Sequence, residues 1–349
     1  MITPTSMKRI RVLIVDDSLF MRAAIAKTLA AGPFDVVGQA KDGNDALAQV
    51  LRLHPDVVTM DFNMPGMNGA EAVRAIMQQR PTPVVMFSAH TSQGAQETFA
   101  ALTAGAVDFV TKPAGEVSVD LGRVAEQLIN KLITAASSKP RAAVPVAPPR
   151  ASASMEIPRT TLPGGLPRLC VIAVSTGGPA ALSEVIPALP PNLRVAVVVV
   201  QHMPAGFTAA LAERLDAASR LSVREAQTAV RPLAGGVLIA PGDKHLEFDA
   251  SGACLLTDGP LVNGCRPSAD VTMQSAVRVY GRRTLGVVMT GMGKDGAAGA
   301  LAIKKSDGKT CAQDQQSSVI WGMPKSAIDA GAIDEVLPLG EIATWLRYA

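Results

Sequence analysis

A serine near the middle of the chain lies where a short apolar run meets a predicted helix. The run 171–174 is rich in β-branched residues, it ends at Ser175, and Pro179 opens the helix after two glycines. Such a strand–turn–helix places the serine hydroxyl at the carboxyl edge of a sheet, beside backbone N–H groups and the positive end of the helix. An acyl-transfer nucleophile needs this setting, because those donors can hold an oxyanion. A helix cap, a phosphate-binding turn and an ordinary loop serine are the alternative interpretations of Ser175.

A histidine and an aspartate follow two further predicted strands. The very apolar strand 193–200 leads to His202, and the strand 285–289 leads through a glycine-rich turn to Asp295. Right-handed crossovers would bring the carboxyl ends of these parallel strands to the same edge as Ser175. We therefore predict a Ser–His–Asp triad in which His202 is the general base and Asp295 orients it. The alternatives are a structural histidine and a phosphate-binding turn, although the turn lacks the common glycine signatures of phosphate sites.

The other histidines and acidic residues fit these two roles less well. His54 and His90 belong to the first third of the chain. His245 follows a turn between two strand-like runs, 236–240 and 246–248, which we predict to form a hairpin away from the catalytic edge. Three aspartates are rivals of Asp295, but none directly links a strand to a helix: Asp258, Asp270 and Asp314.

Polar residues also lie at the ends of successive predicted strands in the first third of the chain. Those strands span 11–15, 57–60, 83–87 and 108–111, and the polar residues that follow or end them are Asp16, Asp17, Asp61, Ser88 and Lys112. Three carboxylates at one edge repel one another unless a cation lies among them, and Mg²⁺ suits a small site lined by oxygen atoms. A carboxylate there can attack a phosphoryl group, whose oxygens Ser88 and Lys112 would then contact. Taken singly, an ordinary loop aspartate or a surface lysine explains each residue better.

The composition indicates large aliphatic cores and little net charge. Of 349 residues, 48% are hydrophobic but only 3% are aromatic, and the formal net charge is +3. So small a charge argues against nucleic acid or a membrane as the main partner. No apolar stretch reaches the roughly 18 residues of a membrane span, and the four cysteines show no metal-ligand spacing. We expect a cytoplasmic, reduced monomer with buried thiols that neither inserts into a membrane nor binds nucleic acid.

Length and pattern together predict two domains. Short apolar runs alternate with helical patterns in both, and such repeats form parallel sheets with helices on both faces. We expect an α/β fold with two doubly wound sheets, a first domain over 9–135 and a second over 167–349 that also holds a β-hairpin. Seven prolines fall between residues 140 and 167, which indicates a flexible Pro/Ala-rich linker over 136–166. The alternative for this segment is a docking peptide for a partner.

The first domain resembles the receiver domains of response regulators. The likeness rests on residues 15–18 (Val-Asp-Asp-Ser), 60–69 (Met-Asp-Phe-Asn-Met-Pro-Gly-Met-Asn-Gly) and 110–113 (Val-Thr-Lys-Pro), and it covers the whole domain. It implies a flavodoxin-like fold and a Mg²⁺ ion at the phosphorylation site. The resemblance assigns these roles: Asp61 as phosphoacceptor, Asp16 and Asp17 with Asp61 and the main-chain carbonyl of Asn63 as Mg²⁺ ligands, Ser88 and Lys112 as phosphoryl-sensing groups, and Phe109 as the switch aromatic.

The second domain resembles the chemotaxis protein-glutamate methylesterases. The matching segments are 175–179, 201–207, 239–242, 266–270, 290–296 and 322–324. The resemblance implies a Rossmann-like fold and an ester reaction that needs no cofactor. It assigns Ser175 as nucleophile, His202 as base and Asp295 as orienting acid, with the main-chain N–H of Met292 and the turn at Thr176 as oxyanion donors.

Together the two resemblances imply a serine esterase that phosphorylation activates. Its substrates would be glutamate γ-methyl esters on the cytoplasmic helices of methyl-accepting chemotaxis receptors, with methanol released and certain receptor glutamines deamidated. A chemotaxis histidine kinase would supply the phosphoryl group. The alternative is a response regulator whose output domain binds DNA, or a phosphate or nucleotide, without catalysis. Against DNA, the second domain shows no helix-turn-helix pattern or basic recognition helix, and a phosphate-binding module has no use for His202.

Overall fold

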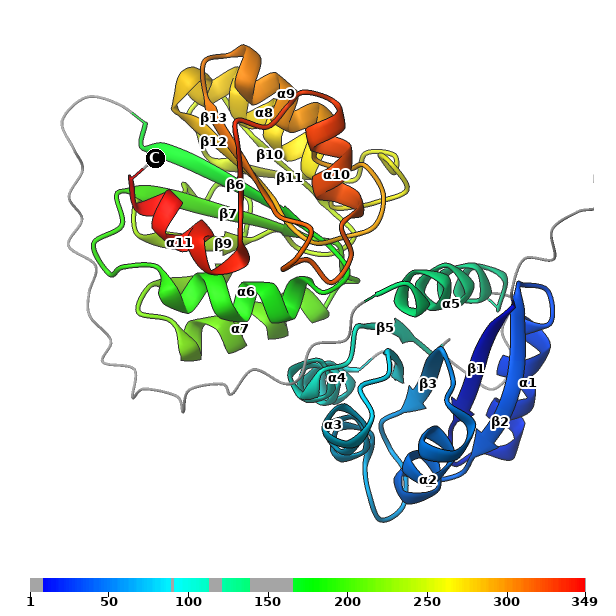
Figure 1. The fold of residues 1–349 in the computed structure, drawn as a ribbon. Coiled ribbons are helices and arrows are strands. Elements are labelled where there is room, and N and C mark those ends of the chain that lie inside the picture. The colour runs from blue at the N-terminus through cyan, green and yellow to red at the C-terminus, as the bar shows by residue number, and fades with distance from the viewer. Residues whose placement is uncertain (1–8, 89–90, 113–120, 139–165, 349) are drawn as a thin grey trace, which may run out of the picture. The chain divides into compact units, whose positions relative to one another are not determined.

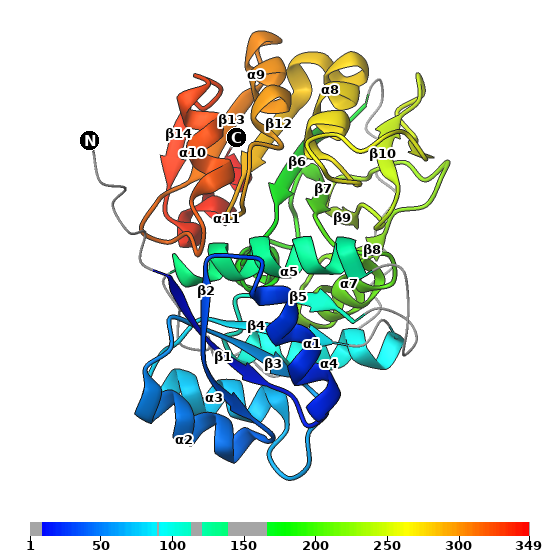
Figure 2. The ribbon, with the colours of Figure 1, turned by 90° about the vertical axis from the view of Figure 1, so that its right-hand side faces the viewer.

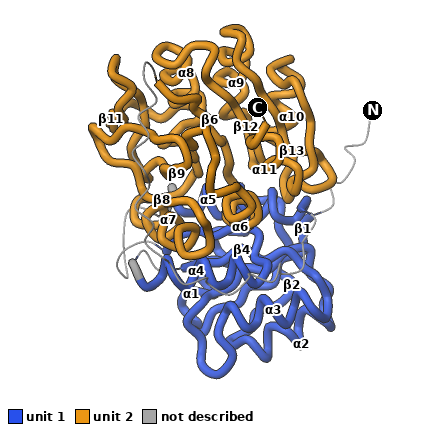
Figure 3. Tube along the Cα trace, turned by 90° about the vertical axis from the view of Figure 1, so that its left-hand side faces the viewer, with its two compact units in different colours: residues 1–145 blue, residues 146–349 orange. Residues whose placement is uncertain are grey.

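The computed structural model describes residues 9–88, 91–112, 121–138 and 166–348. The chain separates into two compact units, Met1–Pro145 and Val146–Ala349, which Figure 3 colours separately. The predicted linker over 136–166 falls almost wholly on residues 139–165, which lie outside the described residues. The predicted domain boundaries therefore stay predictions, and each unit is treated by itself below.

The first unit is a five-stranded parallel sheet with helices on both faces (Figure 1). Its strands run in the order β2-β1-β3-β4-β5. They are β1 (Ile10–Val15), β2 (Phe34–Ala40), β3 (Val57–Asp61), β4 (Val84–Ser88) and β5 (Asp108–Thr111). The helices are α1 (Leu19–Leu29), α2 (Gly43–Leu53), α3 (Gly69–Gln79), α4 (Ser92–Ala104) and α5 (Leu121–Ala136). The parallel α/β fold predicted for this region is confirmed.

Local chemistry explains where these elements begin. Every residue of β3 and β4 is buried, as expected of central strands covered on both faces. Helix α3 begins with a capping box, in which the Asn68 side chain accepts from the Glu71 N–H and the Glu71 carboxylate accepts from the Asn68 N–H. Strand β2 is not evident from the sequence pattern, because this edge strand buries only its end residues and carries polar residues and a glycine between them.

The second unit contains a seven-stranded parallel sheet (Figure 2), in the order β14-β13-β12-β6-β7-β9-β8. Its strands are β6 (Arg168–Val174), β7 (Val195–Gln201), β8 (Ser222–Glu225), β9 (Gly236–Ile239), β12 (Thr284–Val288), β13 (Lys309–Gln313) and β14 (Glu335–Leu337). The helices are α6 (Gly178–Ala188), α7 (Phe207–Ala218), α8 (Ala269–Tyr280), α9 (Ala297–Lys305), α10 (Gly322–Asp329) and α11 (Leu339–Tyr348). Helices α6, α7 and α11 lie together on one face of the sheet, and α8, α9 and α10 on the other (Figure 1).

The predicted hairpin exists, but its strands are different from those expected. The predicted pairing of the run 236–240 with 246–248 is wrong, because β9 joins the main sheet in parallel, between β7 and β8. The hairpin consists of β10 (His245–Phe248) and β11 (Cys254–Thr257). Its turn forms because the Asp249 carboxylate accepts from the Ser251 and Ala253 N–H groups, which stabilises a tight local loop.

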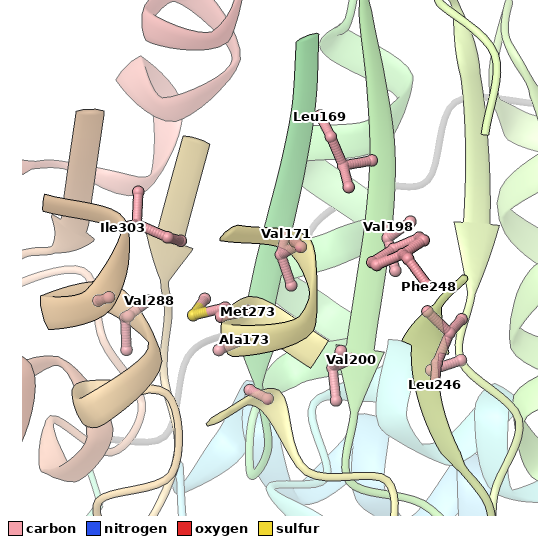
Figure 4. Packing of buried hydrophobic residues seen from close by; sticks show 14 of the residues in the cluster. Leu169, Val171, Ala173, Val198, Val200, Leu246, Phe248, Met273, Val288 and Ile303 are labelled. Carbon is pink, nitrogen blue, oxygen red and sulfur yellow. The ribbon is translucent and has the colours of Figure 1, made fainter. Parts of the chain in front are cut away.

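The core of this unit extends from the sheet through α8 to the hairpin. Buried side chains from all three layers form one cluster, which Figure 4 shows: Leu169, Val171 and Ala173 of β6, Val198 and Val200 of β7, Met273 of α8, and Leu246 and Phe248 of β10. Hydrogen bonds join the same layers, because Thr272 of α8 donates to the Leu246 carbonyl and the Phe248 N–H donates to Ser275. The cluster fixes α8 over the middle of the sheet.

We expect Gly242→Ala to destabilise the second unit. A Cβ atom at Gly242 would lie 2.3 Å from the backbone nitrogen of Ala205 and 2.3 Å from the carbonyl carbon of Pro204. Backbone cannot turn aside as a flexible side chain can, so we expect a loss of about 1–3 kcal/mol in the free energy of unfolding. Urea denaturation followed by tryptophan fluorescence measures this unit alone, because both tryptophans of the chain lie in it.

Gly340→Ala is the matched control for that experiment. A Cβ atom there would lie 3.8 Å from the Glu184 carboxylate, which is ordinary contact, and the position is inside α11. Alanine favours a helix over glycine, so we expect an unchanged or higher free energy of unfolding, by up to about 1 kcal/mol. Equal effects of the two substitutions would show that the close approach at Gly242 does not matter.

Candidate functional site

Three carboxylates meet at the carboxyl edge of the first sheet. Strands β1 and β3 are neighbours at the point where the strand order reverses, the place where ligands bind in open α/β sheets. Asp16 follows β1, Asp61 ends β3, and Asp17 extends the group toward solvent. One oxygen of each lies within 4.8 Å of the others. The structure thus brings together the three predicted acidic residues of the phosphorylation site.

Lys112 bridges two of these carboxylates. Its Nζ lies 3.0 Å from Oδ2 of Asp16 and 2.9 Å from Oδ1 of Asp61. Burial works to lower the pKa of Lys112, but attraction to Asp61 and Asp16 outweighs it, and the pKa of the lysine is raised. Burial is also the largest influence on Asp61 and raises its pKa, although Lys112 acts in the opposite direction. Asp16 and Asp61 therefore share the ammonium of Lys112 as a counter-charge.

The other predicted residues of this site are Ser88, Phe109 and Asn63, and each has a partner outside the acidic group. The buried Ser88 hydroxyl donates to the Gly94 carbonyl at 3.2 Å, toward the start of α4. Phe109 is buried in β5, with the Lys131 ammonium 5.0 Å from its ring centre. The exposed Asn63 donates from its amide to Glu97 at 3.1 Å. The sensing, switching and ligand roles of these residues stay predictions.

The second sheet brings Ser175, His202 and Asp295 to one edge. Ser175 follows β6, His202 follows β7, and Asp295 follows β12, which is the neighbour of β6 on its other side. Backbone hydrogen bonds join the loops: the Ser175 N–H donates to the Thr290 carbonyl at 3.0 Å, and the His202 N–H donates to the Val174 carbonyl at 3.1 Å. The three loops are therefore held together independently of the side chains.

His202 and Asp295 form a close pair. Nε2 of His202 lies 2.8 Å from Oδ2 of Asp295, and both side chains are largely buried. Burial is the largest single influence on His202 and works to lower its pKa, but the hydrogen bonds to Asp295 and Cys265 and the charge of Asp295 together outweigh it and raise the pKa to about 9. Burial likewise works to raise the pKa of Asp295, yet hydrogen bonds from His202 and Ser268 bring it down to about 2. Asp295 is thus a stable anion beside a strongly basic imidazole.

Ser175 lies at the same sheet edge as this pair. Within the described part of the chain, no hydrogen bond joins the Ser175 hydroxyl to His202. The second ring nitrogen, Nδ1, lies 3.6 Å from the Sγ atom of Cys265. The other three cysteines are buried, as expected from the sequence, and Cys265 is partly exposed. Serine–histidine hydrogen bonds are often long without substrate and tighten in the complex, so the arrangement is compatible with a triad.

Glycines allow the loops to approach Ser175. Gly177 adopts a left-handed conformation with φ of 77° before α6. A Cβ atom on Gly291 would lie 2.7 Å from the Ser175 Cβ, so the loop after β12 lies directly against the serine. The carbonyl of the buried Thr176 accepts from the Thr290 hydroxyl at 2.9 Å, and the half-exposed Met292 follows Gly291. The oxyanion roles of Thr176 and Met292 stay predictions.

Sequence reasoning missed the groups that surround Asp295. The carboxylate accepts from the Ser268 hydroxyl at 2.6 Å, from the Ala269 N–H at 2.6 Å and from the Asn263 amide at 3.1 Å. Ser268 is the N-cap residue of α8, and negative charge is stabilised at a helix N-terminus. A serine two residues before an acidic first turn is a recognisable helix start, so this signal was available in the sequence. No comparable signal in the sequence indicated the contact between Asn263 and Asp295.

His245 lies closer to the catalytic edge than predicted. It is buried, its Nδ1 accepts from the Ser268 N–H at 3.2 Å, and its Nε2 contacts the Pro260 carbonyl at 2.9 Å. These partners require a neutral ring with its proton on Nε2. The His245 ring thereby supports Ser268, whose hydroxyl donates to Asp295. His245 therefore has a structural position and not that of a second base.

Comparison with known proteins shows the family. Residues 170–346 match the CheB methylesterase family, and residues 12–119 match the response regulator receiver domain family. A protein-glutamate methylesterase/protein-glutamine glutaminase from Symbiobacterium thermophilum is 47% identical over 350 residues, which cover 97% of each chain. One of the same name from Thermotoga maritima is 43% identical over 337 residues, covering 95% of this chain and 96% of the other. This chain belongs to the CheB methylesterase family.

A solved structure agrees with this CheB assignment. The CheB methylesterase catalytic domain of Thermotoga maritima has a TM-score of 0.51 and 43% sequence identity, and the match covers 53% of this chain and 99% of that domain. The architecture predicted from the sequence, with a receiver sheet followed by a methylesterase sheet, is thus confirmed. No helix in the described residues is long and apolar enough to cross a membrane.

We expect His202 in this CheB family member to titrate near pH 9 and to return toward its usual range, near 6.5, in Asp295→Asn. The substitution keeps the shape of the side chain but removes the charge of Asp295 and the charge-assisted hydrogen bond to it, which together help to offset burial. Because the folded-state pKa lies above the unfolded value, the stabilisation by protonated His202 is complete below about pH 6.5 and disappears as pH rises through about 9.

NMR titration of the ring Cε1–H signals measures this pKa, and His202→Gln identifies the signal. Ser183→Ala serves as the control, because Ser183 donates only to the Pro179 carbonyl within α6. An unchanged titration of His202 in Asp295→Asn would contradict the charge pairing.

Proposed function

We propose that this protein is a phosphorylation-activated serine esterase, which hydrolyses glutamate γ-methyl esters on chemoreceptor cytoplasmic helices and deamidates receptor glutamines. The observation that carries the proposal is the His202–Asp295 pair at 2.8 Å, at the sheet edge where Ser175 also lies, in a chain of the CheB methylesterase family. The curated relatives bear the names of both activities. Because receptor helices of this kind are cytoplasmic, we place the protein in the cytoplasm, as a monomer.

The contacts support a defined route for the proton. The Nε2–H of neutral His202 donates to Asp295, which leaves Nδ1 free to accept the Ser175 proton once the hydroxyl replaces the Cys265 thiol beside it. The serine oxygen then forms a bond to the ester carbonyl carbon, and backbone N–H groups at Thr176 and Met292 hold the oxyanion. The imidazolium returns its proton to the leaving methoxide, and methanol departs from an acyl-enzyme.

The second half of the reaction repeats these steps with water. His202 removes a proton from water, the hydroxide attacks the acyl carbon, and the Ser175 oxygen leaves with the proton that His202 returns. With a pKa of about 9, only about one His202 in a hundred is neutral at pH 7. For a glutamine substrate, the same steps release ammonia instead of methanol.

We propose Asp61 as the phosphoacceptor of the receiver unit. Mg²⁺ would be held by Asp16, Asp17, Asp61 and the main-chain carbonyl of Asn63, and the three carboxylate oxygens within 4.8 Å of one another fit such a hard cation. When bound, Mg²⁺ supplies positive charge that offsets the phosphoryl oxygens.

The Asp61 carboxylate oxygen forms a bond to the phosphorus of a phosphohistidine on the kinase, the P–N bond breaks and the kinase imidazole leaves. Lys112, already 2.9 Å from Asp61, contacts a phosphoryl oxygen. Ser88 would exchange its bond to the Gly94 carbonyl for another phosphoryl oxygen, next to the Phe109 switch position.

An output domain that only binds DNA, or a phosphate or nucleotide, explains the site less well. Such a module gains nothing from a buried histidine–aspartate pair beside a strand-end serine. The glycine-rich loops of this unit are also occupied in contacts between loops, as at Gly291 against Ser175.

We expect Ser175→Ala to lower methanol release from methylated receptor membranes by about 10⁶-fold, the usual effect of removing a triad nucleophile. The fold should persist, because the Ser175 hydroxyl makes no hydrogen bond within the described chain. Ser183→Ala, in the helix that follows, is the matched control and should keep wild-type activity. Methanol release by folded Ser175→Ala within roughly tenfold of wild type would exclude the serine mechanism.

We expect Asp61→Asn to abolish Mg²⁺-dependent labelling by radioactive acetyl phosphate, because the amide cannot serve as the phosphoryl acceptor. The same donor should raise the esterase rate of the wild type by roughly 5- to 150-fold, the usual range of coupling between sites, and should not affect the variant. Asp35→Asn, at an exposed position of β2, is the control. Strong labelling of Asp61→Asn would show that another residue accepts the phosphoryl group.

A further inference from the structure

A tight turn over residues 262–265 lies against the His202–Asp295 pair. The Val262 N–H donates to the Cys265 carbonyl at 3.1 Å, and the Cys265 N–H donates to the Val262 carbonyl at 2.9 Å. Both central residues are left-handed, with φ of 52° at Asn263 and 77° at Gly264. This is the arrangement of a type I′ turn, for which Asn-Gly is the favoured pair. The Asn-Gly pair therefore fixes the backbone position from which the Asn263 side chain extends.

The Asn263 amide bridges two buried carboxylates. Its Nδ2 donates to Oδ2 of Asp270 at 2.8 Å and to Oδ1 of Asp295 at 3.1 Å. Because acceptors lie on both sides, only the NH₂ end of the amide can occupy this place. The other oxygen of Asp270 accepts from the Gly296 and Gly299 N–H groups, at 3.0 and 2.7 Å. The amide thus separates two acidic groups that would otherwise repel each other directly.

The bridge affects the histidine through Asp295. Oδ2 of Asp295 faces Nε2 of His202, while Oδ1 accepts from Asn263, Ser268 and the Asp270 N–H. An N–H dipole aimed at a carboxylate partly neutralises it and fixes its plane, so it weakens the field that holds a proton on the imidazole. The titratable groups that face His202 are Asp295 and Cys265, and the acidic group that faces Asp295 is Asp270.

We propose that Asn263 is a positioning residue for the esterase reaction, acting through Asp295 on the proton-accepting nitrogen of His202. It orients the carboxylate and moderates its negative charge, which keeps part of His202 in the neutral form that can accept the serine proton. The inference rests on the proposed esterase function and adds to it a residue outside the predicted triad. Its contribution should appear in kcat rather than in KM, because Asn263 contacts the acid and not the substrate.

Two variants of the full-length protein separate this role from a purely structural one. Asn263→Gly keeps the left-handed turn and removes the amide, and Asn263→Asp keeps turn and shape but places a third carboxylate beside Asp270 and Asp295. We expect kcat at pH 7 to fall about tenfold in Asn263→Gly and further in Asn263→Asp, with KM unchanged. The acid limb of the pH–rate profile and the NMR titration of His202 should both move to higher pH.

Gly264→Ala is the control, because it strains the same turn, at a φ of 77°, and keeps the amide. Apart from its chain neighbours, a Cβ atom there would have no atom within 4 Å. It should lower thermal stability and leave the His202 titration unchanged. A structural role would expose His202 in Asn263→Gly and move its titration to lower pH; that result, or an unmoved titration, would overturn the proposal. If wild type released no methanol, the esterase function would fail, and the His202 titration would still decide whether Asn263 acts on the histidine.

Discussion

A buried carboxylate must find hydrogen-bond donors or lose its charge, and the second unit is arranged around that requirement at Asp295. Its donors come from four places: the end of β7, the 262–265 turn, the N-cap of α8 and the first turn of that helix. Three of these places lie within residues 263–269, whereas His202 and Asp295 come from distant parts of the sequence. The carboxylate therefore joins three loops that the sheet alone would leave independent. Packing of α8 on the sheet and the hairpin then keeps those donors in place.

The receiver unit balances its acidic groups differently. Asp16 and Asp61 share the ammonium of Lys112, whose long side chain can be redirected toward an incoming anion. Asp295 instead has rigid neutral donors and one histidine, which favour a permanent anion. The carboxyl edge of the first sheet is therefore suited to binding and releasing a charged group. The carboxyl edge of the second sheet is suited to proton transfer over a short distance.

The fold and the site residues at both sheet edges could be predicted from the positions where apolar strands end. The carboxyl ends of parallel strands lie at the same edge of a sheet, whatever the order of the strands. The buried runs of β6, β7 and β12 are short, apolar and followed directly by Ser175, His202 and the loop to Asp295. The contacts that sequence reasoning missed depend on long-range packing. Asn263 lies 32 residues from Asp295 in the chain, and β9 could be assigned to the main sheet rather than to the hairpin only once its neighbours were known.

Glycine at the loop contacts limits how the site can diversify by mutation. Gly291 lies against Ser175 and Gly242 against Pro204, and any side chain at either place would collide with a neighbouring loop. Along β6 and β7 the buried cluster ends at Ala173 and Val200, two residues before the serine and the histidine. Substitutions at the exposed rim can therefore change the surface that the site presents, whereas a side chain at Gly291 or Gly242 forces a neighbouring loop to move.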